Sequence, residues 1–157
     1  MIEHTGHERT ASDARRETWR YALLRYATLL YALGLIVHTG DHLHRGVDVL
    51  TPEVFWAGNI STVLGVAVIA LVLVGHPSAP LFATLLGFTV APGVAAAHLL
   101  PHWSAFSDAF PGAHGTGVTA VSWAVVLIEV AGLLAMAFAG LSLLRGERNE
   151  RVIAAAA

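Results

Sequence analysis

The sequence predicts an all-α integral membrane protein, a four-helix up-down bundle with cytoplasmic N and C termini. Of its 157 residues, 55% are hydrophobic and 13% are charged, and its mean hydropathy is +0.64. Soluble domains carry about 25% charged residues, so this chain has too few polar side chains to cover a water-soluble fold. Lipid can solvate apolar helices because their backbone groups are bonded within each helix. Four apolar segments and an uneven distribution of arginines give the number of helices and their orientation.

The two ends of the chain are polar. Residues 1–18 mix acidic, basic and histidine side chains, and they lack the apolar core of a signal peptide. We expect a flexible, uncleaved cytoplasmic tail there, and a second cytoplasmic tail over residues 147–157. Residues 19–146 then form the membrane domain, with four spans of at least about 20 residues, enough to cross a hydrocarbon core of ~30 Å. The expected spans are residues 19–39, 52–75, 79–100 and 117–145.

Cap and turn residues set the boundaries of these spans. Thr51 is a suitable N-cap, and Pro52 occupies the first helical position of the second span. The stretch "HPSAP" separates the second and third spans, because its prolines cannot continue a helix. Pro101 ends the third span, and Gly146 suits the position after the fourth.

Arginine placement predicts the topology. All nine basic residues are arginines; five precede or enter the first span, three follow the last, and Arg45 alone lies in a loop between spans. By the positive-inside rule, both termini are cytoplasmic and the chain is a multi-pass protein of the cell membrane. The loops after the first and third spans then face the extracytoplasmic side. Four aromatic residues fit a belt at that interface: Trp56, Trp103, Phe106 and Phe110.

Small residues recur at helical spacing in two spans. Ala131, Ala135 and Ala139 follow one another at intervals of four in the fourth span, as do Gly87 and Ala91 in the third. Small side chains let transmembrane helices approach closely. We therefore expect close helix contacts along these two stripes.

Six of the nine histidines gather on the extracytoplasmic side of this topology. In regular helices His38 would lie ~26 Å from Tyr21 and His98 ~27 Å from Pro80, two residues near the cytoplasmic starts of their spans, because each residue adds about 1.5 Å. The two residues therefore reach a similar depth. The other histidines predicted on this side are His42, His44, His102 and His114, and they are accompanied by Asp41, Asp48 and Asp108.

The spacing of these residues is typical of metal ligands. His38 and His42 are four residues apart, and Asp41 is three from His38, so on a helix they share a face. His98 and His102 are also four apart. Imidazole nitrogen suits Zn, Cu, Fe and Ni, and a carboxylate can complete a mixed ligand set. We therefore predict a transition-metal site formed by these five residues.

Two residues favour His38 and His98 as the principal ligands of that site. Gly40 can end the first helix before Asp41, and Pro101 places His102 beyond the end of its helix. A haem b held by His38 and His98 is an alternative form of the same site.

The six residues "HTGDHL", which begin at His38, resemble the His…Asp-His signature on a helix of nickel/cobalt permeases. The gap between the first histidine and the Asp-His pair is shorter here, and the chain has fewer spans. The resemblance implies that this grouping of side chains can bind a metal, without implying membership of that family.

Glu129 lies about midway along the fourth span, in "AVVLIEVAGLL". A charged side chain at the bilayer centre costs on the order of 3 kcal/mol, so Glu129 is expected to face the bundle interior. It is a candidate proton carrier or ion ligand, or a protonated carboxyl bonded to a neighbouring helix. Asn59 in the second span is a possible partner.

Three functions are compatible with these features. The first is a metal or haem site serving metal handling, electron transfer or a small membrane enzyme. The second is a non-catalytic membrane subunit or scaffold without a cofactor, and the third is a small proton-linked or metal transporter acting as an oligomer. The expected partners are the lipid bilayer and a homo-oligomer or larger membrane complex. A net charge of −2 gives no argument for nucleic acid, and the absence of cysteine excludes thiolate chemistry.

Overall fold

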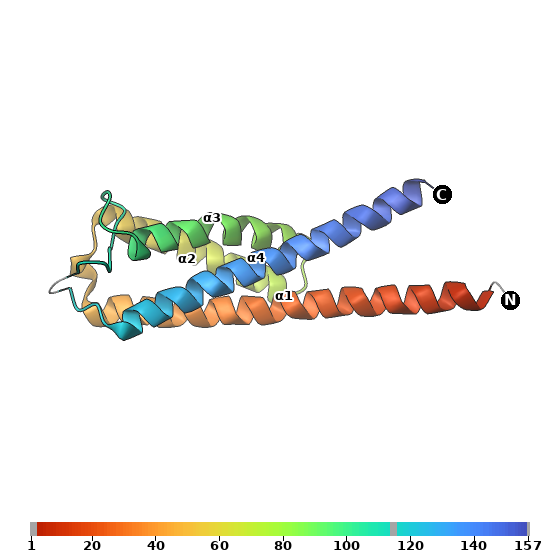
Figure 1. Cartoon of the computed structure of the whole chain (residues 1–157), viewed down its shortest axis with the longest axis horizontal. Helices are drawn as coiled ribbons and strands as arrows, with labels where there is room; N and C mark the ends of the chain where they lie inside the picture. Colours follow the sequence, from red (N-terminus) through yellow and green to blue (C-terminus); the bar gives the residue numbers. More distant parts are fainter. Residues whose placement is uncertain (1–2, 114–115, 157) are drawn as a thin grey trace.

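The computed structural model describes residues 3–113 and 116–156, and every regular element in that part of the chain is helical. Successive helices run in opposite directions, so that the two termini lie at one end of the molecule (Figure 1). Each of the four long helices contains a stretch that is long and apolar enough to cross a membrane. The predicted all-helical class is therefore confirmed. The elements are α1 (Glu3–Arg45), the short 3-10 helix η1 (Val47–Val49), α2 (Pro52–Leu73), α3 (Ala79–Leu99) and α4 (Ala120–Ala155).

The first and last helices extend beyond the predicted spans. α1 begins at Glu3, within the segment expected to be a flexible tail, and α4 continues through Gly146 to Ala155. Gly146 is therefore an interior helical residue and not a C-terminal cap. Beyond it, the polar end of α4 includes an ion pair from Arg151 to Glu147, 3.5 Å apart and one helical turn away. Such pairs support a solvated helix by a few tenths of a kcal/mol.

Gly40 does not end α1, contrary to our expectation. Glycine inside a helix costs only about 1 kcal/mol relative to alanine, and the following turn is held by an ion pair between Arg45 and Asp41. The helix ends instead where Gly46 adopts a φ of 94°, a conformation that favours glycine. Asp41 and His42 are therefore helical.

The predicted start of α2 is confirmed. The hydroxyl of Thr51 accepts a hydrogen bond from the Val54 N–H at 3.2 Å, and Pro52 follows the cap. α4 begins with a reciprocal cap in which the Ser122 hydroxyl accepts from the Thr119 N–H at 3.1 Å. Both caps satisfy backbone donors that the first helical turn leaves unpaired.

Glycines bring the backbones of α1 and α4 into direct contact. A Cβ atom at Gly34 would lie 2.5 Å from the Cα of Glu129, and one at Gly132 would lie 2.6 Å from the Cα of Tyr31. Only glycine allows this approach, as is typical of closely packed membrane helices. The contact fixes the depth at which Glu129 faces α1.

α4 packs equally closely against α3. A Cβ at Gly140 would lie 2.6 Å from the carbonyl oxygen of Pro80, and one at Gly87 would clash with the carbonyl oxygen of Leu133. The expectation of a close contact at Gly87 is therefore confirmed. α4 thus holds both α1 and α3, and the largest fully buried side chains of the bundle include Leu24, Tyr31, Leu133 and Met136.

The small-residue stripe predicted on α4 is displaced by one residue. Ala131, where the predicted stripe begins, is exposed. The buried row consists of Gly132, Met136 and Gly140, which also recur every four residues. Glycine permits closer backbone contact than alanine, so the glycine-containing row faces the neighbouring helices.

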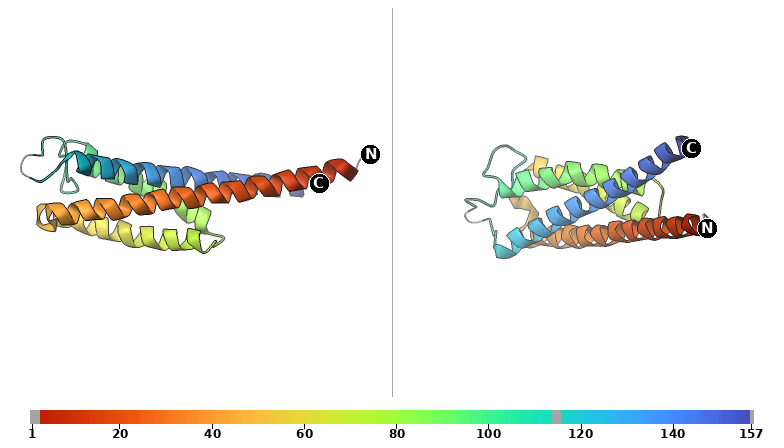
Figure 2. Two further views of the ribbon diagram at one scale, coloured as in Figure 1. Left: turned by 90° about the horizontal axis from the view of Figure 1, so that it is seen from below. Right: turned by 45° about the vertical axis from the view of Figure 1, so that its right-hand side comes forward.

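α2 is the least enclosed helix. Only 17% of its apolar window is buried, compared with 44% in α4. Seen from below, α2 and α4 lie on opposite sides of α1 (Figure 2). The four buried residues of α2 are Val54, Gly65, Val68 and Val72.

Candidate metal centre

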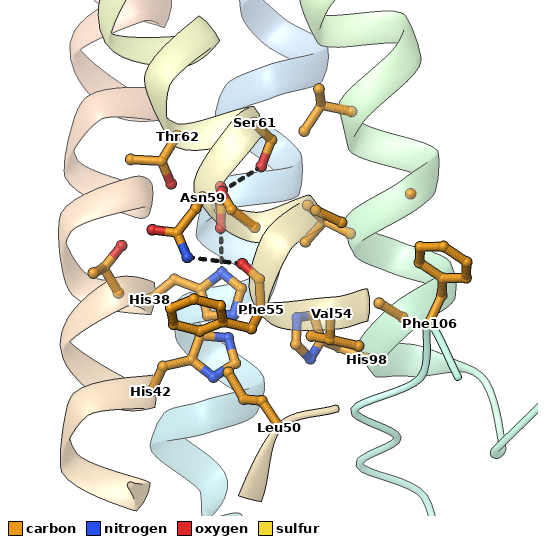
Figure 3. Close-up of a pocket in the computed structure, with 18 of the residues that line it drawn as sticks. His38, His42, Leu50, Val54, Phe55, Asn59, Ser61, Thr62, His98 and Phe106 are labelled. Carbon is orange, nitrogen blue, oxygen red and sulfur yellow. Dashed lines mark hydrogen bonds and ion pairs between the residues drawn. The ribbon is translucent and has the colours of Figure 1, made fainter. Parts of the chain in front are cut away.

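Three histidines from two helices converge at the end of the bundle opposite the termini. His38 and His42 come from α1, and His98 comes from the last turn of α3. One ring nitrogen from each lies within 4.8 Å of the other two. The ring centroids are 4.6 Å apart for His38 and His42, 4.8 Å for His38 and His98, and 5.4 Å for His42 and His98. Figure 3 shows the three rings grouped behind the first turn of α2.

Local structure explains this convergence. α1 and α3 run in the same direction and end close together (Figure 1). Residues four apart share a helical face, so continuous helix through Gly40 places His38 and His42 side by side. The sequence places His38 and His98 at a similar depth, and in the structure the two side chains lie next to each other.

Two of the three imidazoles have their Nδ1 atoms held by acceptors. The Nδ1 of His38 is hydrogen-bonded to the carboxylate of Glu129 on α4. The Nδ1 of His98 lies 3.2 Å from the backbone carbonyl oxygen of Asp108 and 3.4 Å from its carboxylate. An acceptor at Nδ1 favours the tautomer whose Nε2 lone pair is free to bind a metal.

The Nε2 of His38 is buried and has no hydrogen-bond partner among the residues that the structure describes. The side chain is only 9% exposed, so water cannot readily satisfy this nitrogen. A buried polar atom without a partner costs about 1–3 kcal/mol. A bound ligand at this position would remove that cost.

The third imidazole faces an arginine–carboxylate pair. The Nδ1 of His42 lies 3.8 Å from the Asp108 carboxylate and 3.3 Å from a terminal nitrogen of Arg45. At 3.3 Å the Arg45 guanidinium donates to the Nδ1 of His42, whereas the 3.8 Å separation from Asp108 is too long for a hydrogen bond. Metal binding through Nε2 requires the other tautomer, in which Nδ1 carries the proton and faces the Asp108 carboxylate.

Arg45 links the histidines to a wider buried network. Its side chain is fully buried and forms a hydrogen-bonded ion pair with the carboxylate of Asp108. Its Nε lies 3.3 Å from Asp41, close enough for an ion pair but without hydrogen-bond geometry. Asp41 in turn accepts a hydrogen bond of 2.9 Å from the hydroxyl of Ser122 on α4.

Asp108 is ionised at neutral pH. Burial alone would raise its pKa, but the hydrogen bond with His98 and the charge of Arg45 outweigh burial, so the pKa lies below its usual value. The ionised carboxylate therefore serves two neighbours, the guanidinium and the imidazole.

The loop between α3 and α4 folds back over the end of α3 and carries Asp108 to the histidines. The Asp108 N–H donates to the Ala97 carbonyl at 3.0 Å, and the Phe110 N–H donates to the His98 carbonyl at 2.9 Å. These bonds satisfy acceptors that the end of a helix leaves unpaired. The buried ring of Phe110 also lies 4.9 Å from the ring of His98.

The remaining predicted site residues lie apart from the three histidines. Asp41 is buried but bonds Ser122 instead of approaching the imidazoles. His102 is exposed beyond the end of α3, as Pro101 predicts, and is not part of the group. Asn59 donates to the Phe55 carbonyl of its own helix at 2.8 Å.

Glu129 is buried, with 4% exposure, and faces the bundle interior as expected, but its partner is His38 and not Asn59. His44 is exposed, and His114 lies outside the described residues.

Sequence reasoning missed the roles of Arg45 and Asp108. The sequence groups Asp108 only with the other acids expected on the extracytoplasmic side, and its separation of ten positions from His98 gives no periodic signal. Arg45 did carry a signal, because it is the one arginine that departs from the cytoplasmic clustering. A lone cation at the opposite end, next to several acids, is compatible with a buried ion pair.

No family model, curated protein sequence or solved structure matches this chain.

Proposed function

We propose that this chain is a multi-pass membrane protein that holds one transition-metal ion through His38, His42 and His98 at its extracytoplasmic face. The observation that carries the proposal is the convergence of three imidazoles, two of them held at Nδ1 by carboxylate or carbonyl oxygens. Metal-binding histidines in proteins commonly donate their other N–H to such acceptors. Three histidines also make up the protein ligands of some zinc sites that keep a fourth position for an outside ligand.

The buried charges support a bound metal cation. Asp41, Asp108 and Glu129 are carboxylates buried around a single buried guanidinium, that of Arg45. Acidic side chains thus outnumber the guanidinium by three to one. Buried charges are costly unless they are balanced, so a bound metal cation would favour this arrangement.

The donor set favours Zn, Cu, Fe or Ni over Mg or Ca, because imidazole suits the former and the latter prefer oxygen. A haem b between His38 and His98 is less well supported. Their ring centroids are 4.8 Å apart, and His42 lies within 5.4 Å of both. A porphyrin ring would have to separate these three side chains.

The extracytoplasmic placement rests on the arginines. Eight of the nine lie in the N-terminal part of the chain up to Arg25 or from Arg145 onward, at the end away from the histidines. The positive-inside rule then puts the termini in the cytoplasm and the histidines on the opposite side.

Metal analysis of protein purified without chelator tests this proposal. We expect about one metal ion per chain, lost in His38→Ala and His98→Ala. The matched controls are His44→Ala and His102→Ala, which remove exposed histidines outside the group. Helical content measured by circular dichroism verifies that each variant is folded.

Two outcomes would contradict the proposal. One is folded protein that binds no metal in the presence of added Zn²⁺, Cu²⁺ or Ni²⁺, which would favour a scaffold without a cofactor. The other is an equal loss of metal in the control variants. A haem absorption spectrum would support the haem alternative instead.

A further inference from the structure

A cavity of about 500 Å³ lies between α1, α2 and α3 and ends at the three histidines. Its volume falls within the range of small-molecule sites, about 300–1,000 Å³. Figure 3 shows His38, His42 and His98 at one end of this cavity, with α2 in front of them. The site proposed above therefore borders a space large enough for an organic molecule.

The lining of the cavity is mostly apolar. Its aliphatic side chains include Leu35, Val54, Val90 and Val94. Two of the three polar residues of α2 in the lining donate to carbonyl groups of their own helix, Ser61 to Gly58 at 2.9 Å and Asn59 to Phe55 at 2.8 Å. The third is Thr62. The three imidazoles lie together at the end of the cavity away from Thr62 (Figure 3).

Small residues on the helices keep this space open. Gly58 of α2 and Gly93 of α3 both line the cavity, and a Cβ atom at either position would meet nothing within 4 Å. This differs from the glycines of the α4 contacts, where a Cβ would strike the backbone of a neighbouring helix. The glycines of the cavity border unfilled space and are not required for close packing.

We infer that the cavity binds a molecule with a single apolar chain and an uncharged oxygen head group, a hydroxyl or a carbonyl, directed at the metal. The inference rests on the proposed metal site. The apolar lining selects the chain, because burial of methylene groups is favourable and burial of unpaired polar groups is not. An ion held by three protein ligands accepts an outside oxygen as its fourth.

The residues that line the cavity select an uncharged head group. They include no lysine or arginine, and Glu129 is their one acidic residue. A carboxylate head would therefore find no basic side chain in the lining to pair with, and an unpaired buried charge is costly. A hydroxyl or carbonyl oxygen avoids that cost.

Cobalt(II) provides a direct probe, because its visible absorption bands respond to a change of ligand. The protein in lipid nanodiscs is loaded with Co²⁺ and titrated with 1-dodecanol, and separately with dodecanoate, dodecane and ethanol. We expect 1-dodecanol to change the bands at concentrations where dodecane and ethanol do not, and dodecanoate to act more weakly.

The matched variants are Gly93→Leu and Gly40→Leu. Gly93→Leu fills part of the cavity, whereas Gly40 is an exposed helical glycine outside the lining, with nothing within 4 Å of its Cβ position. Because the new side chain takes the space of several methylene groups, we expect Gly93→Leu to raise the 1-dodecanol midpoint at least about tenfold. Both variants should keep the cobalt bands.

The outcomes separate this inference from the metal site. If cobalt bands form but no response to 1-dodecanol follows, the cavity inference is wrong and the metal site stands. A stronger response to dodecanoate overturns the uncharged head group, and an equal effect of Gly40→Leu overturns the location. If no cobalt bands form in the unmodified protein, the proposed function itself is wrong.

Discussion

The two sides of α1 are packed in different ways. On one side, α4 approaches so closely that Gly34 and Gly132 allow backbone-to-backbone contact. On the other side, α2 buries only four residues and leaves a cavity of about 500 Å³. The close contact positions Glu129 against His38, and the looser one leaves space beside the same imidazole. The close contact provides the rigid support that a preorganised site requires, and the open side leaves room beside it for the proposed ligand.

A larger side chain at the close contact between α1 and α4 should have the largest effect, a loss of stability. Gly34→Val places side-chain atoms where the α4 backbone already lies, so the two helices must separate. We expect a loss of about 3 kcal/mol or more in the free energy of unfolding, at the upper end of overpacking effects. Thermal unfolding in detergent, with Gly40→Val as the exposed control, measures it. A loss equal to that of the control would contradict the packing account.

Removing the carboxylate that α4 supplies should have the second-largest effect, a loss of metal affinity. In Glu129→Gln the side chain keeps its size but no longer provides a charged acceptor for the Nδ1 of His38. Loss of such a partner typically lowers metal affinity 10–100-fold. Isothermal titration with Zn²⁺ provides the measurement, and an unchanged affinity would show that Glu129 does not hold the ligand.

We expect a smaller decrease in metal affinity for Asp108→Asn. His98 would lose the carboxylate but keep the backbone carbonyl of residue 108 at 3.2 Å. We therefore expect a decrease in Zn²⁺ affinity near the lower end of the same range, about 10-fold. A loss greater than that in Glu129→Gln would mean that the α3–α4 loop, and not α4, provides the main support.

Changes on the open side should have the smallest effect on stability. Gly58→Ala adds a methyl group that meets nothing within 4 Å. Alanine is favoured over glycine in helices by about 1 kcal/mol, so we expect the free energy of unfolding to stay the same or rise by up to that amount. Thermal unfolding measures this too, and a marked loss would indicate that α2 is packed more tightly than the cavity implies.

The sequence predicted the helices better than their contacts. Apolar segment length and the caps at Thr51 and Pro52 are local properties, so four helices could be recognised without a structure. The end of α1 was missed because the preference of Gly40 for a helix end was outweighed by the interactions of Arg45, which depend on Asp108, 63 residues away. Such interactions leave no periodic pattern in the sequence.

The candidate site was likewise predicted in part. His38, His42 and His98 could be grouped because helix length and spacing fix their depth and face. Asp41 shares α1 with His38 and His42, but the position of Ser122 across the α1–α4 contact decides where its carboxylate points. That contact depends on which row of small residues faces α1, and the alanine and glycine rows of α4 have the same spacing.

X-ray absorption at the edge of the bound metal tests the central claim most directly. It should be measured on the purified protein in nanodiscs and on His42→Ala. We predict three imidazole nitrogens bound to the metal, at about 2.0–2.1 Å for zinc, and two in the variant. A metal without bound histidine nitrogen, or a ligand set that is unchanged in His42→Ala, would contradict the claim.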